Sequence, residues 1–128
     1  MTRVLALDYG SARCGCAVSD PTGTLATPLA PVERPRTERG LKAIADLAGA
    51  QDVSRVVVGL PVSLSGEEGA QAAEARAFAE RLRPVVGIPV DTWDERFTTR
   101  LARSTPGRHA EDSRAAAHLL QSWLEAHR

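Results

Sequence analysis

A run of apolar residues in the middle of the chain, VVVGLP at 56–61, most limits what this sequence can fold into. Such a β-branched run is typical of a strand that is buried on both faces, as central parallel strands are. The residues 37–51 before it and 69–83 after it carry apolar side chains at helical spacing. A buried strand between two amphipathic helices predicts crossover connections and an α/β fold.

Further segments extend the predicted sheet on both sides of this run. The other predicted strands cover 3–8, 14–19, 24–33 and 88–93, and the other predicted helices cover 98–103 and 111–127. Two prolines in the segment 24–33 indicate an edge strand, because proline cannot donate to a neighbouring strand. We therefore expect a mixed five-stranded sheet that is antiparallel at its start, with helices on both faces.

Chain length and composition predict a single domain over residues 1–128. A chain of 128 residues with 43% hydrophobic residues is long enough for one two-layer core and too short for two independent ones. We expect the helix at 69–83 to turn one face toward this core and to be ended by Pro84. The expected inner face consists of Ala73, Ala77, Phe78 and Leu82.

Charge and terminal sequence narrow the functional classes. The formal net charge is zero, so any affinity for nucleic acid must come from a local patch. The first residues lack the apolar stretch of an export signal, and no segment approaches the roughly 20 apolar residues of a membrane span. The two cysteines, Cys14 and Cys16, are expected to be small buried thiols on one face of a strand. These features predict a cytoplasmic protein.

Three acidic residues adjoin segments that are predicted to be buried, where a carboxylate is costly unless it is paired. Asp8 ends the first strand, Glu95 follows the fifth strand, and Asp112 begins the last helix. Ligands gather at the carboxyl ends of parallel strands, and hard divalent cations prefer oxygen ligands. We interpret these acids as catalytic ligands of two Mg²⁺ or Mn²⁺ ions in a phosphodiester-cleaving nuclease, with Asp8 between both ions.

Each acid also has a structural interpretation. Asp8 could cap the turn at Gly10, Asp112 could be an N-cap or first-turn acid, and Glu95 could form a solvated ion pair. Alternation along the strand sends Asp94 and Glu95 to opposite faces, so only one of them should face the site. Two other acids are weaker candidates: these are Asp20, which precedes a turn, and Asp91, which we expect on an exposed strand position.

The segment 96–110, between two of the proposed metal ligands, is basic and contains no acid. A polyanionic substrate would have to lie there, although a solvated helix face is the ordinary interpretation of such a run. The candidate nucleic-acid contacts are Arg96, Thr98, Thr99, Arg100, Arg103 and Arg108. The polar loop at 60–69 could close over a substrate or be an ordinary surface loop.

Four segments together resemble one known family: LALDYGSARCGCAVSD, VVVGLPVSLSGEEGAQAAEARAFAERL, DERFTT and DSRAAAHLLQSWL. They are similar to the YqgF family, also called RuvX, of Holliday junction resolvases and pre-ribosomal RNA nucleases. The resemblance implies a ribonuclease H-like fold, a bacterial cytoplasmic origin, and metal-dependent endonuclease action on structured RNA or branched DNA. It also implies that the catalytic acids are Asp8, Glu95 and Asp112. One departure from the family is the segment between the last two motifs, which is short and contains Pro106 and Gly107.

Two other functional classes stay open at this point. The hairpin LDYGSARCGCAVSD also resembles the phosphate-binding hairpin of the actin and sugar-kinase phosphotransferases, but those enzymes enclose ATP between two such domains. The second class is a non-catalytic nucleic-acid-binding factor in transcription or ribosome assembly. Symmetric resolution of a DNA junction, which is part of the first hypothesis, would favour a homodimer.

Overall fold

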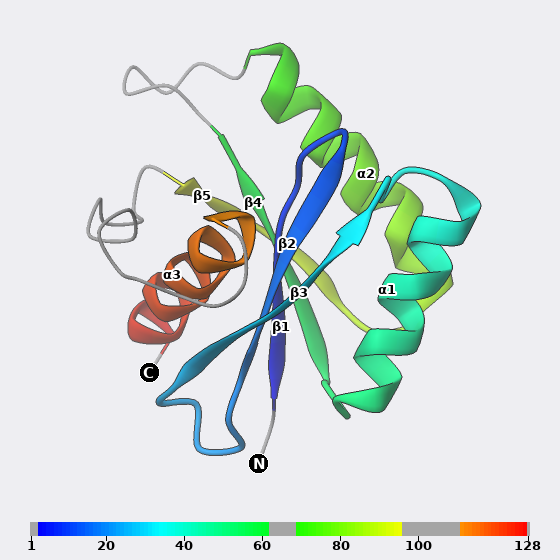
Figure 1. Cartoon of the computed structure of the whole chain (residues 1–128). Coiled ribbons are helices and arrows are strands. Elements are labelled where there is room, and N and C mark those ends of the chain that lie inside the picture. Colours follow the sequence, from blue (N-terminus) through cyan, green and yellow to red (C-terminus); the bar gives the residue numbers. More distant parts are fainter. Residues whose placement is uncertain (1–2, 62–68, 96–110, 128) are drawn as a thin grey trace.

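The computed structural model of this protein describes residues 3–61, 69–95 and 111–127, with only the backbone at 111 and 112. Its elements in chain order are β1 (Val4–Asp8), β2 (Arg13–Ser19), β3 (Ala26–Glu33), α1 (Glu38–Ala50), β4 (Arg55–Leu60), α2 (Ala70–Val86), β5 (Val90–Asp94) and α3 (Glu111–Ala126) (Figure 1). The helix predicted at 98–103 and most of the loop predicted at 60–69 lie outside the described residues.

The five strands form one mixed sheet in the order β3-β2-β1-β4-β5. The pairs β1–β2 and β2–β3 are antiparallel, whereas β1–β4 and β4–β5 are parallel. The proline-containing strand β3 lies at one edge, and β4, the run that is apolar along its length, lies between two parallel neighbours. The predicted mixed five-stranded sheet is therefore confirmed.

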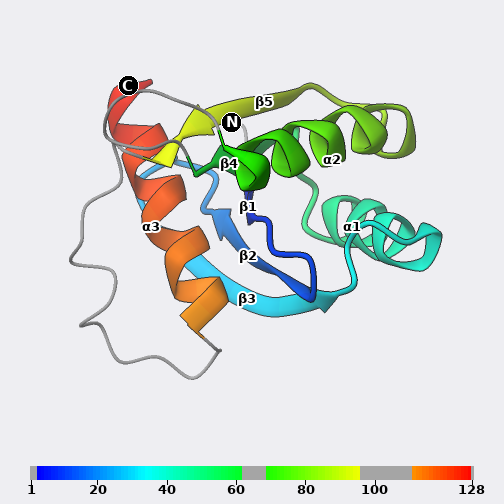
Figure 2. The same cartoon turned by 90° about the horizontal axis from the view of Figure 1, so that it is seen from above.

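Helices cover both faces of the sheet, as predicted (Figure 2). The helices α1 and α2 pack on one face, where Ile44 and Phe78 join Leu5 and Leu7 in a buried cluster. On the other face α3 packs against Val4, Ala6 and Val57 through Ala116, Leu119 and Leu120. Since side chains of a strand alternate between faces, the even-numbered positions of β1 face α3, and Asp8 continues this series.

The helix α2 differs from its prediction in two ways. It runs to Val86 and ends at Gly87, which has a φ of 69° and whose N–H donates to the Arg83 carbonyl. Pro84 does not end the helix, because a proline in the last turn removes only one helical hydrogen bond.

The inner face of α2 was also wrongly predicted in part. Phe78 and Leu82 are buried as expected, but Ala73 and Ala77 are exposed. The other buried positions are Ala72, Ala75 and Ala79. An alanine-rich helix has several faces of similar hydrophobicity, so the two large side chains and the packing partner decide which alanines are buried.

The predicted helix at 37–51 and the predicted buried cysteines are confirmed. The side chain of Thr37 caps α1 by accepting a hydrogen bond from Gly40 N at 3.0 Å. Cys14 and Cys16 are fully buried free thiols in the same core cluster. Within the described ranges, no helix is long and apolar enough to cross a membrane.

Candidate active site

Asp8 and Glu95 lie together at the carboxyl end of the parallel strands. Asp8 is the last residue of β1, and Glu95 directly follows β5. Both line a pocket of about 290 Å³. The remaining lining residues are Tyr9, Gly10, Ser11, Pro61, Gln71 and Glu74. The structure thus brings together two of the three acids singled out from the sequence, which are 87 positions apart.

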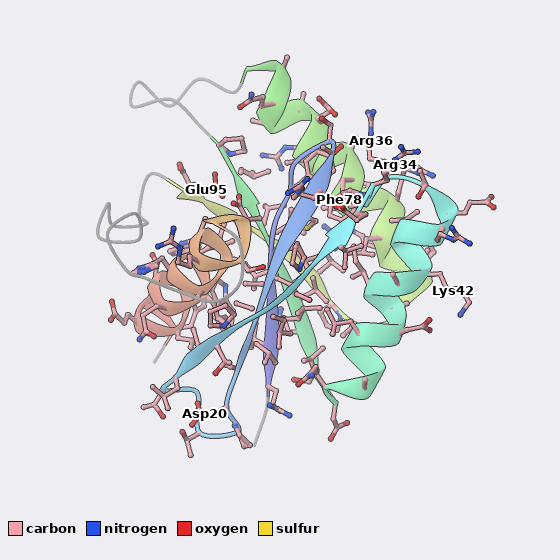
Figure 3. The ribbon with its side chains drawn as sticks, viewed as in Figure 1. Asp20, Arg34, Arg36, Lys42, Phe78 and Glu95 are labelled. Atoms are coloured by element: carbon pink, nitrogen blue, oxygen red, sulfur yellow. The ribbon has the colours of Figure 1, made fainter. Side chains whose placement is uncertain are left out.

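A glycine on the intervening strand makes room for the Glu95 carboxylate. In the β1–β4 register Leu7 pairs with Val58, so the next positions, Asp8 and Gly59, are neighbours. A Cβ at Gly59 would stand 2.5 Å from Glu95 Oε1 and 2.9 Å from Leu119 Cδ2. A side chain at position 59 would therefore require the ends of Glu95 and Leu119 to shift. Figure 3 shows Glu95 at the end of the sheet.

Gly59 was not among the site residues predicted from the sequence. The available signal was a glycine inside an otherwise β-branched strand, which often marks a close approach by another group. The partner that approaches, however, is far away in the sequence. Gly10, by contrast, serves the β1–β2 turn as expected, because a Cβ there would be 2.7 Å from the Arg13 carbonyl oxygen.

The first turn of α3 is held against the middle of the sheet. Ser113 is fully buried, and its Oγ accepts a hydrogen bond from Cys16 N at 3.3 Å. Cys16 pairs with Leu7 in the β1–β2 register, so this contact holds the start of α3 close to the end of β1. Asp112 precedes Ser113 in the same turn, but the structure describes only its backbone. The metal-binding role of Asp112, like those of Asp8 and Glu95, therefore stays a prediction.

Polar contacts among Tyr9, Glu74 and Arg36 support the wall of the pocket opposite Glu95. The Tyr9 hydroxyl donates to Glu74 Oε1 at 3.1 Å, and the same oxygen is 3.1 Å from Arg36 Nη1. The Tyr9 ring stacks on Phe78, with ring centroids 4.7 Å apart. Burial, together with the hydrogen bond to Glu74, raises the pKa of Tyr9 to about 12. The phenol is therefore neutral near pH 7 and remains a donor to Glu74.

The weaker acidic candidates have structural roles outside the pocket. Asp20 accepts hydrogen bonds from Thr24 N at 2.8 Å and Leu25 N at 2.9 Å. These bonds, led by the one from Leu25, lower the pKa of Asp20 and stabilise the β2–β3 turn. Asp91 forms an ion pair with Arg55 of the neighbouring strand.

The donor chemistry of the pocket fits hard divalent cations, because its charged atoms are carboxylate oxygens. Among the side chains that the structure describes, no three potential ligands stand together as one metal site. A complete three-acid site would therefore need Asp112. The predicted nucleic-acid contacts in the segment 96–110 also lie outside the described residues.

Solved structures with this fold include two resolvases. The RuvC of T. thermophilus, in complex with a Holliday junction substrate, matches with a TM-score of 0.61 at 14% identity, over 99% of this chain and 97% of that one. The fowlpox virus Holliday junction resolvase matches with a TM-score of 0.54 at 11% identity, over 98% and 99%. The fold class is therefore ribonuclease H-like, as the sequence predicted.

The sequence comparison is more specific than the fold. Residues 2–126 match the family model of RuvX, described as Holliday junction resolvase. A protein of Myxococcus xanthus (strain DK1622) is 38% identical over 98% of this chain and 89% of its own length. One of Anaeromyxobacter sp. (strain Fw109-5) is 42% identical over 96% of both. Both are named "Putative pre-16S rRNA nuclease". This chain belongs to the RuvX family of nucleases, so the family resemblance is confirmed.

Proposed function

We propose that this protein is an endonuclease that hydrolyses phosphodiester bonds in structured nucleic acid, with Asp8, Glu95 and Asp112 as its metal ligands. One observation carries the proposal: Asp8 and Glu95 line one pocket, and the Glu95 carboxylate occupies the space that a side chain at Gly59 would fill. Nuclease relatives of nearly the same length support the reaction class.

The proposed metal ligands and the pocket wall have different roles in this reaction. Asp8, Glu95 and Asp112 would hold one or two Mg²⁺ or Mn²⁺ ions, which supply charge stabilisation and an activated water at neutral pH. Asp8 ends the central strand β1, where it pairs with Gly15 of β2, and the residue before it, Leu7, pairs with both β2 and β4. The Tyr9–Glu74 hydrogen bond holds the opposite wall. No protein nucleophile is needed for this reaction.

The substrate that we favour is the precursor of 16S rRNA, cleaved at the 5′ end of the mature sequence. The names of the similar proteins from Myxococcus and Anaeromyxobacter support this choice. Branched DNA of the Holliday junction type is the second candidate, supported by the description of the family model. Symmetric cleavage of a junction would require a second copy of the chain for the second strand.

The segment 96–110 completes the proposed substrate surface. Its candidate phosphate contacts are Arg96, Thr98, Thr99, Arg100, Arg103 and Arg108. This segment connects β5 with α3, so both of its ends adjoin proposed metal ligands. Guanidinium groups offer paired donors to phosphate oxygens, and hydroxyl groups add further donors.

The first prediction is that Asp8→Asn and Glu95→Gln each abolish cleavage. The amides keep the shape of the side chains and remove the charge that a divalent ion needs, so cleavage should fall by at least about a hundredfold. End-labelled structured RNA and a four-way DNA junction would be incubated with each purified protein in Mn²⁺ and, separately, in a chelator.

A matched control is Asp91→Asn, which removes a carboxylate from β5 outside the pocket. It should cleave at the wild-type rate. Cleavage by Asp8→Asn at that same rate would contradict the assignment and favour a non-catalytic binding factor.

A further inference from the structure

A second pocket, rich in arginine, adjoins the acidic one. It has a volume of about 300 Å³ and is lined by Ser11, Ala12, Arg34, Arg36 and Thr37. Both arginines are exposed (Figure 3). The two pockets share Ser11 of the β1–β2 turn, so one extended ligand can reach both. The acidic pocket is lined by three carboxylates, whereas the second pocket has no acidic lining residue in the described part of the chain.

The backbone at Arg34 is held in a costly conformation. Its φ of 46° lies in the left-handed region, which costs a residue other than glycine about 1 kcal/mol or more. The Arg34 N–H donates to the Ala12 carbonyl at 2.9 Å, and the Arg34 carbonyl accepts from Thr37 Oγ1 at 2.8 Å. A Cβ at Gly40 would stand 2.2 Å from that carbonyl oxygen. These contacts therefore hold Arg34 in a backbone conformation that glycine would adopt with less strain.

The two arginines of this pocket differ in their partners. Arg36 is paired with Glu74, whose carboxylate also accepts the Tyr9 hydroxyl, so Arg36 is tied to the wall of the acidic pocket. Within the described ranges Arg34 has no ion-pair partner. As far as the described residues show, its guanidinium is thus the charged group of this pocket that is available to an anion.

We propose that the Arg34–Arg36 pocket binds a backbone phosphate of the nucleic-acid strand whose scissile bond lies in the neighbouring acidic pocket. This inference rests on the proposed nuclease function and adds a surface to it, on the side of the β1–β2 turn away from Glu95. A nucleic-acid strand that runs past Ser11 would lead from the carboxylates of the acidic pocket to the guanidinium groups of Arg34 and Arg36. Arg34 makes the main contact, and Arg36 is the positioning residue that links the two pockets through Glu74.

The test uses Arg34→Gly, which removes the guanidinium and relieves the positive φ. Thermal stability should be unchanged or higher, since glycine adopts this conformation without strain. Binding of a fluorescein-labelled four-way junction and of a labelled structured RNA would be measured in Ca²⁺, over about 50 to 200 mM salt. We expect about tenfold weaker binding of both probes and, for the DNA, a log–log salt slope reduced by about 0.9.

The control variant is Arg39→Ala, which removes an equal charge from the exposed side of α1 and does not line the pocket. It should bind like the wild type. Wild-type affinity in Arg34→Gly, or an equal loss of affinity in Arg39→Ala, would overturn the phosphate-binding role of the pocket. Either result would leave the nuclease assignment intact. Failure of the wild-type protein to bind either probe would overturn both proposals.

Discussion

At the scale of single residues, Gly59 has the clearest effect on the proposed chemistry. The glycine lies on the central strand β4, next to Asp8 in the sheet, and the Glu95 carboxylate takes the space of its missing side chain. The glycine at this position therefore leaves room for the Glu95 carboxylate beside Asp8. The same position is packed by Cδ2 of Leu119 of α3, so a side chain there would require Leu119 to move as well.

We predict that Gly59→Ala lowers cleavage by more than about tenfold and destabilises the fold by about 1–3 kcal/mol, because the methyl group displaces Glu95 and overpacks against Leu119. Cleavage rates and chemical denaturation would measure the two effects. Gly49→Ala is the control, since a Cβ there meets nothing within 4 Å. That change should leave cleavage intact and stabilise α1 by up to about 1 kcal/mol. Unaltered cleavage in Gly59→Ala would show that the position of Glu95 is not critical.

At the scale of elements, α3 is held at both of its ends. Near its start the buried Ser113 accepts the Cys16 N–H, and near its end Ser122 accepts Trp93 Nε1–H at 3.2 Å. The apolar contacts of Leu119 and Leu120 lie between these two hydrogen bonds. Only the first contact adjoins Asp112, so the two ends of the helix should differ in their effect on catalysis.

We predict that Ser113→Ala costs about 1–3 kcal/mol, because it leaves the buried Cys16 N–H without its acceptor. Cleavage should also fall, because the first turn of α3 would no longer be held beside Asp8. Ser122→Ala removes a comparable hydrogen bond from the other end and should preserve cleavage. Equal cleavage by both variants, measured well below their melting temperatures, would argue against a contribution of α3 to the site.

At the scale of the whole molecule, the carboxylates link folding to ion binding. Asp8 ends β1 and Glu95 follows β5, the strands on either side of β4, and Asp112 comes from the last helix. The proposed site therefore exists only in the folded chain. Any ion that binds this site stabilises the folded state by mass action.

We predict that Mn²⁺ or Mg²⁺ raises the melting temperature of the wild-type protein. A concentration one hundredfold above the dissociation constant adds about 2.7 kcal/mol, which corresponds to a shift of several degrees. Thermal unfolding across millimolar ion concentrations would measure the shift. It should disappear in Asp8→Asn and persist in Asp91→Asn, whereas an identical shift in both variants would place the bound ion elsewhere.

Much of this protein was predictable from the sequence because the signals are local. The β-branched run of β4, the alternation in β1 and the prolines of β3 each have a direct backbone or burial consequence, and together they predict the mixed sheet. The order of the motifs also indicated the family, and the placement of Asp8 and Glu95 after buried strands indicated the site. The catalytic and metal-binding roles of Asp8, Glu95 and Asp112, the single domain and the contacts in 96–110 stay predictions.

Other features depend on the packing of segments that are distant in the sequence. The prediction of the buried face of α2 was wrong in part. The alanines of this helix offer several similar faces, and only contact with the sheet selects one. The space for Glu95 over Gly59 depends on the register of β4 between β1 and β5. Likewise the arginine pocket exists because the residue after β3 bonds to the β1–β2 turn. Local patterns determine which elements form, whereas the close approaches between them are decided by tertiary packing. A local signal such as Gly59 can mark a close approach, but it does not identify the distant partner.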